Sequence, residues 1–237
     1  MIKKILIDEQ GNKYYWISGD LHTKLGKVAE KDILKGGKVT SHLKKRFTVI
    51  DATFADATEK IERGPAVISK KDIGTIITTT GINHESKIVD IGTGSGMLAL
   101  HLANISKNVT SYEKTKEFAD IAKKNAEKCD VEITIKNKDI MEGIDEKNAD
   151  VITVDLKEPW VILNFMETSL KPGGFCVAYL PHITQVQRLC VEAMKMNFYI
   201  QKISETNERE WMVDELKARP HNVGIQHTGF LVFLRRI

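Results

Sequence analysis

Three glycines at alternate positions mark the part of this sequence whose chemistry is clearest. Gly92, Gly94 and Gly96 follow a short apolar run, residues 88–91, and precede a longer one that starts at Met97. A strand, a glycine turn and a helix form the corner that binds phosphates or nucleosides in doubly wound α/β folds. Glycine is needed there because the backbone must turn tightly and approach a ligand without an intervening Cβ. We therefore predict ligand contacts from all five residues of the turn: Gly92, Thr93, Gly94, Ser95 and Gly96.

The spacing of these glycines indicates which ligand the turn binds. A dinucleotide-binding turn has the pattern GxGxxG, whereas this turn has GxGxG and continues with Met97. Glu113 ends the next apolar run, about 20 residues past the turn, where a carboxylate can accept hydrogen bonds from ribose hydroxyls. A ribose without a pyrophosphate points to S-adenosylmethionine. A plain tight turn is the alternative interpretation, and the position of Glu113 argues against it.

Two aspartates stand where predicted parallel strands end, which is where such sheets bind their ligands. Asp139 and Ile140 follow the third strand, and we predict that they meet the adenine of the cofactor; a surface cap is the alternative role for Asp139. Asp155 ends the fourth strand and is followed by Pro159-Trp160, where the proline suits the first turn of a helix. We predict that Asp155 lies beside the transferable methyl group, as a cofactor contact and as the catalytic residue.

A further group of candidate functional residues lies near the C-terminus. Trp211, Arg219, His221 and His227 are close together in the sequence. A strand hairpin in which the tryptophan packs and an arginine caps a sheet edge explains this pattern without any function. The sequence alone gives a catalytic role for His227 little support.

These side chains must be positioned by regular secondary structure. From residue 87 onward, predicted strands alternate with predicted helices. Strands are predicted at 87–91, 108–112, 131–135, 150–155, 174–179, 198–203 and 227–234, and helices at 96–104, 115–128, 159–170 and 184–196. Such alternation predicts an α/β fold: a mainly parallel sheet with helices on both faces. Five βα units followed by two successive strands predict the Rossmann-like sheet of S-adenosylmethionine-dependent methyltransferases.

The N-terminal part has a different pattern. Two short apolar runs flank Gln10-Gly-Asn12 and predict a β-hairpin. We therefore predict a small N-terminal β-domain over residues 1–62 and the catalytic domain over residues 63–237. Gly64-Pro65 is the expected linker. Asp72 is then expected to N-cap a helix over residues 73–80.

Composition sets limits on the class of protein. The chain has 237 residues, 42% of them hydrophobic, and no apolar run approaches the ~20 residues of a membrane span. The three cysteines are scattered and lack metal-site spacing, so we expect a reduced, cytoplasmic environment and no metal. The net charge is only +3, but residues 1–75 carry 15 Lys/Arg against 10 Asp/Glu. This basic part suggests a polyanionic partner, and ordinary solvated lysines explain it equally well.

Taken together, the segments resemble the tRNA (adenine-N1)-methyltransferases that modify adenosine 58 in the T-loop and, in archaea, also adenosine 57. The resemblance covers nearly the whole chain. It rests on Arg63-Gly-Pro65 with Lys71-Asp72, Asp90-Ile-Gly-Thr-Gly-Ser-Gly96, Ser111-Tyr-Glu113, Val154-Asp-Leu-Lys-Glu-Pro-Trp160, Glu208-Arg209 with Trp211, Arg219-Pro220, and His227-Thr-Gly-Phe230 with Arg235-Arg236. The glycine motif is generic to methyltransferases, whereas the Asp-Leu-x-x-Pro-Trp and His-Thr-Gly-Phe segments together are much more specific.

The resemblance implies S-adenosylmethionine as methyl donor, tRNA as substrate and a homotetramer that holds the tRNA across subunits. It also implies that five residues contact the substrate: Arg63, Lys71, Trp160, Arg219 and His227. One departure is visible, because many relatives have Tyr-Pro-Lys-Asp where this chain has Ser69-Lys-Lys-Asp72. A tyrosine near the target base is therefore missing at position 69.

Two other classes of protein remain open. A protein carboxyl methyltransferase of the isoaspartyl type has a similar fold, but the basic N-terminal part and the Pro-Trp segment argue against it. A non-catalytic RNA-binding subunit of a methyltransferase complex is the other class. Such a subunit is expected to have lost the glycines, Glu113 or Asp155, and all of them are present.

Overall fold

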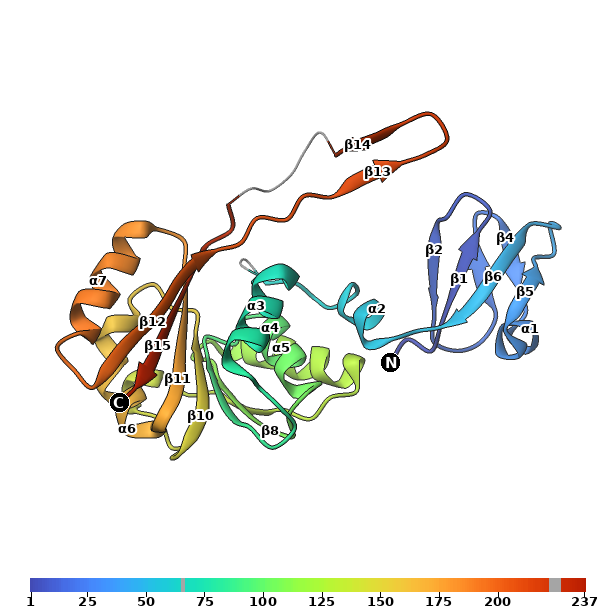
Figure 1. Ribbon diagram of the computed structural model, residues 1–237. Helices are drawn as coiled ribbons and strands as arrows, with labels where there is room; N and C mark the ends of the chain where they lie inside the picture. Colours follow the sequence, from blue (N-terminus) through green and yellow to red (C-terminus); the bar gives the residue numbers. More distant parts are fainter. Residues whose placement is uncertain (65–66, 222–226) are drawn as a thin grey trace. The chain divides into compact units, whose positions relative to one another are not determined.

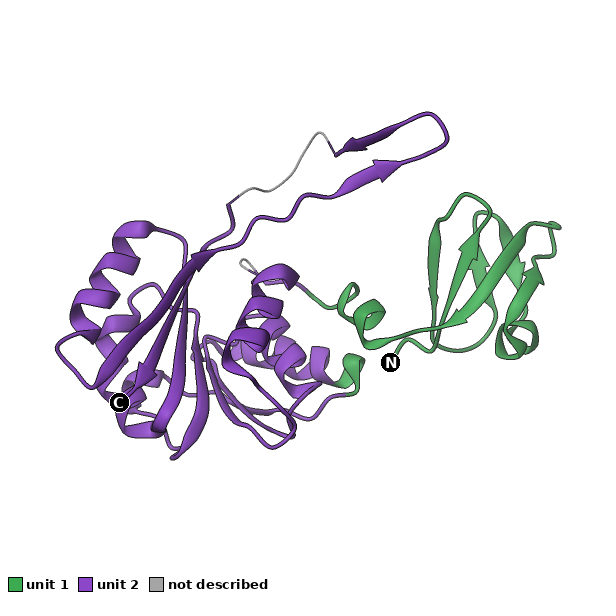
Figure 2. Cartoon of the chain, in the orientation of Figure 1, with its two compact units in different colours: residues 1–62, 127–130 green, residues 63–126, 131–237 purple. Residues whose placement is uncertain are grey.

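The computed structural model describes residues 1–64, 67–221 and 227–237 of the chain. These residues form two compact units, shown in Figure 2: residues 1–62 with 127–130, and residues 63–126 with 131–237. Pro65, in the expected linker, lies outside the described residues. Within the described ranges, none of the helices combines the length and the apolar character that crossing a bilayer requires.

The first unit is built on a four-stranded antiparallel sheet. Its strand order is β2 (Lys13–Trp16), β1 (Lys4–Asp8), β6 (Arg46–Asp51) and β5 (Gly37–Thr40). The predicted hairpin is confirmed, since Ile5 pairs with Tyr15 and Leu6 with Tyr14. Inward residues of the sheet alternate with outward ones and form a core around Leu6, Trp16 and Phe47.

Shorter elements complete this unit. They are β3 (Leu21–Thr23), β4 (Gly26–Val28), α1 (Glu30–Lys35) and α2 (Phe54–Thr58). The sequence pattern did not predict the two helices, because each has less than two turns and too few residues to show a helical period.

The second unit contains the predicted α/β sheet. Its order is β12 (Phe198–Glu205), β15 (Phe230–Arg236), β11 (Leu170–Leu180), β10 (Ala149–Val154), β7 (Lys87–Ile91), β8 (Asn108–Tyr112) and β9 (Thr134–Lys136). The five strands from β11 to β9 are parallel, and β15 runs antiparallel between β11 and β12. The connections reverse direction between β7 and β10, and a doubly wound sheet binds its ligand at that point, outside the carboxyl ends of the strands.

Helices cover both faces of this sheet (Figure 1). Three of them, α3 (Lys70–Thr80), α4 (Met97–Ala103) and α5 (Lys116–Cys129), lie on one face, and α6 (Leu163–Ser169) and α7 (Ile183–Ala193) on the other. The second group packs on the sheet through a large apolar cluster that includes Leu163, Met166, Val186 and Leu189. Two 3₁₀ turns, η1 (Ile140–Glu142) and η2 (Pro159–Ile162), stand at strand ends. The Rossmann-like fold is thereby confirmed.

Three local expectations need correction. Helix α3 begins at Lys70 with Ser69 as its N-cap residue, so Asp72 lies in the first turn and is fully buried instead of capping. The predicted helix over residues 159–170 is the 3₁₀ turn η2 followed by α6. The last strand starts at Phe230 and not at residue 227, so that His227 and Thr228 precede it.

A separate two-stranded sheet lies in the chain between β12 and β15. Its strands are β13 (Trp211–Val213) and β14 (Ala218–Pro220). The hairpin interpretation of this segment is correct, but the expectation that Trp211 packs is wrong, since 58% of its surface is exposed. Its ring lies 5.9 Å from the Arg209 guanidinium.

Candidate active site

The glycine turn joins β7 to α4 in a backbone conformation that other residues rarely adopt. Gly92, Gly94 and Gly96 have φ angles of +89°, +53° and +87°. A Cβ on Gly92 would lie 2.4 Å from the carbonyl oxygen of Asp155, whereas a Cβ on Gly94 would meet nothing within 4 Å. The first glycine therefore permits close packing of β7 against the end of β10, and the second leaves open space above the turn.

Glu113 is held from two sides at the end of β8. Its Oε2 accepts a hydrogen bond from the Gly94 amide at 2.9 Å, and its Oε1 accepts one from the Thr115 amide at 2.9 Å. The residue is 8% exposed. Each carboxylate oxygen has a second lone pair, so the fixed carboxylate can accept two further hydrogen bonds.

A layer of polar side chains lies beneath the turn. Asp90, which is 2% exposed, accepts hydrogen bonds from the hydroxyls of Ser111 at 2.6 Å and Thr153 at 2.7 Å. Thr93 shares a hydrogen bond of 2.6 Å with Ser111. Burial raises the pKa of Asp90, against the lowering effect of the two hydroxyls. The hydroxyl of Thr93 therefore points down into the protein and braces the turn.

Ser95 and Gly96 also act on the protein side of the turn. The Ser95 carbonyl accepts a hydrogen bond from the buried Asn125 amide at 2.9 Å. A Cβ on Gly96 would lie 3.3 Å from the Cβ of Ala122, so glycine lets the turn approach helix α5 closely.

A cavity of about 460 Å³ opens at the carboxyl ends of the strands, a volume within the ordinary range of small-molecule sites. The sequence-predicted residues that line it are Gly92, Gly94, Glu113, Asp139, Ile140 and Asp155. Apolar side chains such as Phe118, Leu156 and Val161 also line it. The donors and acceptors of the glycine turn and Glu113 at one wall, with apolar side chains at the others, fit an adenosine group.

The two roles that the sequence presented as alternatives for Asp139 do not exclude each other. Its Oδ1 accepts a hydrogen bond of 3.0 Å from the Met141 amide, which makes it the N-cap of η1. It also lines the cavity, together with Ile140.

Asp155 stands at the end of β10, between the large cavity and a small one. Its amide donates to the Ile91 carbonyl at 2.9 Å, which continues the pairing of β10 with β7. The small cavity, of about 20 Å³, is shared with Asp90 and the glycine turn. Burial, and secondarily the negative charge of Asp90, raise the pKa of Asp155 to about 6. A carboxylate in such a place gains free energy from any positive charge that develops nearby.

The five residues expected to contact the substrate do not line either of these cavities. Trp160 in η2 has the Arg188 guanidinium 4.3 Å from its ring, and its indole N–H is buried without a partner among the described residues. Arg63 is exposed, and Arg219 lies half-buried on β14.

Lys71 and His227 are already engaged within the protein. The Lys71 ammonium contacts Asp72 at 2.8 Å and Thr228 at 2.7 Å, and its side chain is only 8% exposed. The ring of His227 is hydrogen-bonded to Glu205 and to the Pro181 carbonyl, and these two bonds raise its pKa.

Several lining residues were missed by the sequence reasoning. They are Lys114, Phe118, Lys138, Met141, Leu156 and Val161. All six stand one to six residues after the end of a predicted strand. The signal that could have found them is therefore the general rule that a doubly wound sheet builds its site from the loops at strand ends.

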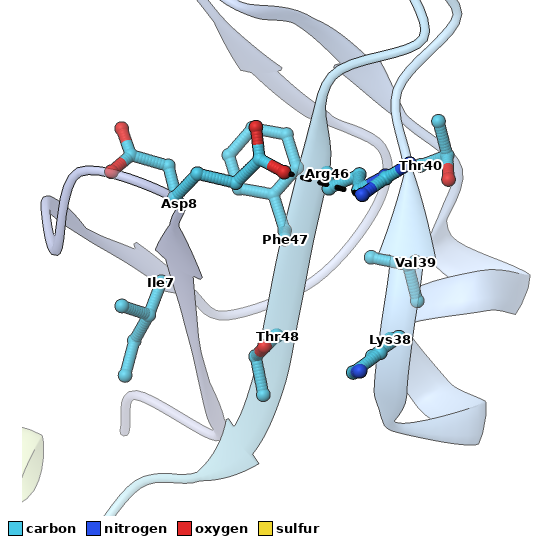
Figure 3. Close-up of a pocket in the computed structure, with 9 residues that line it drawn as sticks. Ile7, Asp8, Lys38, Val39, Thr40, Arg46, Phe47 and Thr48 are labelled. Carbon is cyan, nitrogen blue, oxygen red and sulfur yellow. Dashed lines mark ion pairs between the residues drawn. The ribbon is translucent and has the colours of Figure 1, made fainter.

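The first unit has a cavity of its own, of about 510 Å³, over strands β1, β6 and β5 (Figure 3). Its polar lining combines the cationic Lys38 and Arg46 with the hydroxyls of Thr40 and Thr48 and the carboxylates of Asp8 and Glu9. Arg46 is paired with Glu9 at 3.6 Å, although its side chain is 79% exposed. Among the described residues, no three His, Cys, Asp or Glu side chains gather as a metal ion requires.

Known proteins are similar to this chain in sequence. Residues 47–229 match the family described as tRNA methyltransferase complex GCD14 subunit. The tRNA (adenine(57)-N(1)/adenine(58)-N(1))-methyltransferase TrmI of Methanocaldococcus jannaschii is 33% identical, over 98% of this chain and 94% of its own length. The tRNA (adenine(58)-N(1))-methyltransferase TrmI of Thermus thermophilus is 31% identical, over 98% and 96%.

Solved structures agree on the fold. A SAM-dependent O-methyltransferase from Thermotoga maritima superposes with a TM-score of 0.89 at 25% identity, over 100% of this chain and 93% of that one. The tRNA (m1A58) methyltransferase TrmI of Aquifex aeolicus gives a TM-score of 0.82 at 23% identity, over 99% and 96%. With the match over residues 47–229 and two relatives above 30% identity along nearly their whole length, this chain belongs to the GCD14 family of tRNA methyltransferases.

Proposed function

We propose that this protein transfers a methyl group from S-adenosylmethionine to N1 of an adenosine in tRNA, at position 58 and, as a second target, position 57. One observation carries the chemical part: a half-buried carboxylate, Asp155, stands at the wall of the cavity that the glycine turn and Glu113 also line. The names of the relatives from Methanocaldococcus jannaschii and Thermus thermophilus support the substrate and the positions.

Different residues of the large cavity bind different parts of the cofactor. Glu113, fixed by the Gly94 and Thr115 amides, is placed to accept the ribose hydroxyls. Asp139 and Ile140 stand at the next strand end, where they are suited to the adenine. Gly92 and Gly94 let the backbone approach the ligand, while Thr93, Ser95 and Gly96 hold the turn in shape. S-adenosylmethionine, when bound, supplies an electrophilic methyl group.

Asp155 stabilises the positive charge that develops on the adenine and does not act as a general base. N1 of adenine attacks with a lone pair and has no proton to lose, so the reaction needs no general base at that atom. The methylated adenine is cationic. A preorganised carboxylate near N1 and N6 stabilises that charge as it develops, and this stabilisation is stronger where water is excluded. The apolar burial that raises the pKa of Asp155 provides such an environment.

The target adenosine must leave the stack of the folded tRNA before it can reach this cavity. The exposed Arg63, the half-buried Arg219 and the partly exposed ring of Trp160 are the candidates for contacts with the RNA. His227 joins them through its raised pKa, which favours a positive charge. The engaged ammonium of Lys71 suits a structural role better than a direct contact, although the resemblance implied the contact.

The first unit is our candidate for a second RNA surface. Lys38 and Arg46 stand on the same cavity wall as the hydroxyls of Thr40 and Thr48, groups that commonly contact the sugar-phosphate backbone. A homotetramer remains part of the proposal. Trp211, Val213 and Leu216 on the β13–β14 hairpin are 58%, 74% and 91% exposed, as residues of an interface would be in a single chain. A purely monomeric protein in sedimentation at micromolar concentration would contradict this part.

The test of the function is mass spectrometry of a tRNA transcript after incubation with the protein and S-adenosylmethionine. We expect 1-methyladenosine at position 58, and transcripts with guanosine at 57 or 58 assign each position separately. Asp155→Asn keeps the side chain's size and one acceptor oxygen but removes the charge. We expect it to bind S-adenosylhomocysteine as the parent does and to lose about 10²-fold or more in kcat, comparable to removing one preorganised electrostatic interaction.

The same experiment separates the two alternatives. A protein carboxyl methyltransferase would leave the tRNA unmodified and label an isoaspartyl peptide offered in its place. A non-catalytic subunit would bind the tRNA without modifying either substrate. Either outcome with the pure parent protein would overturn the proposal.

A further inference from the structure

Four side chains form a polar network around the buried Asp72, outside both cavities. Asp72, which is fully buried, accepts hydrogen bonds from the hydroxyls of Ser69 at 2.8 Å and Thr228 at 2.7 Å. Lys71 is paired with its other oxygen at 2.8 Å and donates to the Thr228 hydroxyl at 2.7 Å. Lys71, Asp72 and Thr228 therefore form a closed triangle in which each member contacts the other two.

The triangle joins segments that are distant in the chain. Lys71 and Asp72 belong to the first turn of α3, whereas Thr228 stands just before β15, 156 residues after Asp72. A second polar contact, between the hydroxyls of Thr75 and Thr206 at 3.3 Å, ties α3 to the chain that leaves β12. Helix α3 is thus anchored to the C-terminal part of the sheet through side-chain hydroxyls and one ion pair.

The backbone of this C-terminal segment holds Tyr179. The Tyr179 hydroxyl donates to the Thr228 carbonyl at 2.6 Å. A Cβ on Gly229 would lie 2.5 Å from Cζ of the same ring, so the ring packs directly on the glycine backbone. Burial, and then the charges of Asp72 and Asp155, raise the pKa of Tyr179, which keeps its hydroxyl protonated as a donor.

Tyr179 is a neighbour of Asp155. Strands β10 and β11 are parallel and pair Val154 with Ala178, so the residues that follow, Asp155 and Tyr179, emerge side by side at the carboxyl end of the sheet. A shift of residues 227–229 would therefore be transmitted through Tyr179 to the neighbourhood of Asp155.

Stability alone does not account for such an arrangement. Removing two charges from water is costly, and apolar replacements of a buried ion pair are often neutral or stabilising. A network of fully satisfied hydrogen bonds does, however, specify one geometry, because each partner has only one position in which all bonds are made.

We propose that Asp72 is a positioning residue for methyl transfer, which with Lys71 and Thr228 fixes Tyr179 beside Asp155. This inference rests on the proposed function and adds to it a set of residues that act from outside the cofactor cavity. It also gives a role to Lys71, whose ammonium is engaged inside the protein.

Thr228 provides the matched pair of variants. Thr228→Val keeps the shape of the side chain and removes both hydrogen bonds of the hydroxyl, whereas Thr228→Ser keeps them. We expect Thr228→Val to bind S-adenosylhomocysteine within twofold of the parent and to lose about 10- to 100-fold in kcat for tRNA methylation, as misplaced reacting groups do. Thr228→Ser is expected to retain most of the parent's kcat.

A double-mutant cycle then tests the route through Tyr179. Tyr179→Phe removes the hydrogen bond to the Thr228 carbonyl. If the triangle acts through this residue, the kcat losses of Thr228→Val and Tyr179→Phe will not multiply in the double variant. Losses that multiply would overturn the route, and a Thr228→Val enzyme with a kcat within twofold of the parent would overturn the positioning role itself.

The Lys71–Asp72 ion pair provides an independent test of the positioning role. Lys71→Met with Asp72→Asn removes both charges and keeps an acceptor for Ser69 and Thr228. We expect it to unfold near the parent's temperature and still to lose kcat. The control is Lys116→Met with Asp120→Asn, an exposed pair on α5 at 2.6 Å, which should change neither. Full kcat in the Lys71/Asp72 variant would overturn the inference. A parent protein that fails to methylate tRNA would instead contradict the proposed function.

Discussion

The amide of Gly94 donates a hydrogen bond of 2.9 Å to Oε2 of Glu113, which lies 19 residues further along the chain. This bond connects the glycine turn after β7 to the end of β8. It fixes the carboxylate before any ligand arrives, so that little side-chain entropy is lost on binding. The turn and the acidic residue, which were predicted separately as cofactor contacts, are therefore one preorganised unit.

Glu113→Ala tests this unit. The variant leaves the Gly94 and Thr115 amides, and the ligand hydroxyls that we assign to Glu113, without their acceptor. We expect the affinity for S-adenosylhomocysteine in calorimetry to fall by ~1–3 kcal/mol, the cost of polar groups left unpaired. Glu117→Ala, on the exposed first turn of α5, is the control and should bind as the parent does. Undiminished binding by Glu113→Ala would remove Glu113 from the ribose role.

The different surroundings of Gly92 and Gly94 predict two different defects from the same substitution. Gly92→Ala places a Cβ 2.4 Å from the Asp155 carbonyl at a φ of +89°, so we expect it to lower the unfolding free energy by at least about 2 kcal/mol. Gly94→Ala meets no atom within 4 Å and is expected to cost only about 1 kcal/mol of backbone strain.

Ligand affinity should be affected more by Gly94→Ala, whereas stability should be affected more by Gly92→Ala. The Cβ of Gly94→Ala enters the open space of the cavity, and we expect most of the affinity for S-adenosylhomocysteine to be lost although the protein remains folded. Urea titration gives the stabilities and calorimetry the affinities. Equal loss of stability in both variants would contradict the described turn.

The raised pKa of Asp155 predicts how stability changes with pH. Its pKa is about 6 in the folded protein, against an ordinary value of 3.8. Between these values the folded state binds more protons than the unfolded state, so the unfolding free energy falls as pH rises from about 4 to about 6 and stays lower above that. Asp155→Asn removes this pH-dependent loss of unfolding free energy.

We therefore expect Asp155→Asn to be more stable than the parent at pH 8, by at most about 3 kcal/mol, and equal to it near pH 4. Thermal unfolding of both proteins without cofactor, across that pH range, is the measurement. A difference that does not change with pH would mean that Asp155 titrates normally. A variant that is more stable but less active is also expected on general grounds, because a carboxylate buried for catalysis lowers the stability of the parent protein.

Lys38 and Arg46, which line the cavity of the first unit, predict salt-dependent RNA binding. Lys38→Ala with Arg46→Ala should weaken tRNA binding, and the slope of log affinity against log salt should become shallower by about 1 for each phosphate that the variant no longer neutralises. Neither residue lines the cofactor cavity, so S-adenosylhomocysteine affinity should not change. Lys195→Ala, an exposed lysine that follows α7, is the control. An unchanged salt slope would exclude these two residues from the RNA surface.

Much of the site was predictable because its signals are local. The glycine spacing predicted the turn, and the apolar runs predicted the strand ends that carry Glu113, Asp139 and Asp155. Element boundaries were less accurate. Asp72 has the residue type of an N-cap, but the structure buries its carboxylate completely, because two hydroxyls and an ammonium satisfy it. A sequence pattern contains no information about a partner that arrives from 156 residues away.

The sequence by itself determined the α/β class, the glycine turn and the family, since these depend on residue types at short and regular spacing. Only the tertiary structure decided that β15 inserts between β11 and β12, which brings Thr228 to Lys71 and to Tyr179. It also decided how far Asp155 is removed from water and that the buried Asp90 lies near it, and these two effects, in that order, raise the pKa of Asp155. Burial and distant pairing follow from strand order and register, which are set by how the whole core packs and not by any one stretch of the chain.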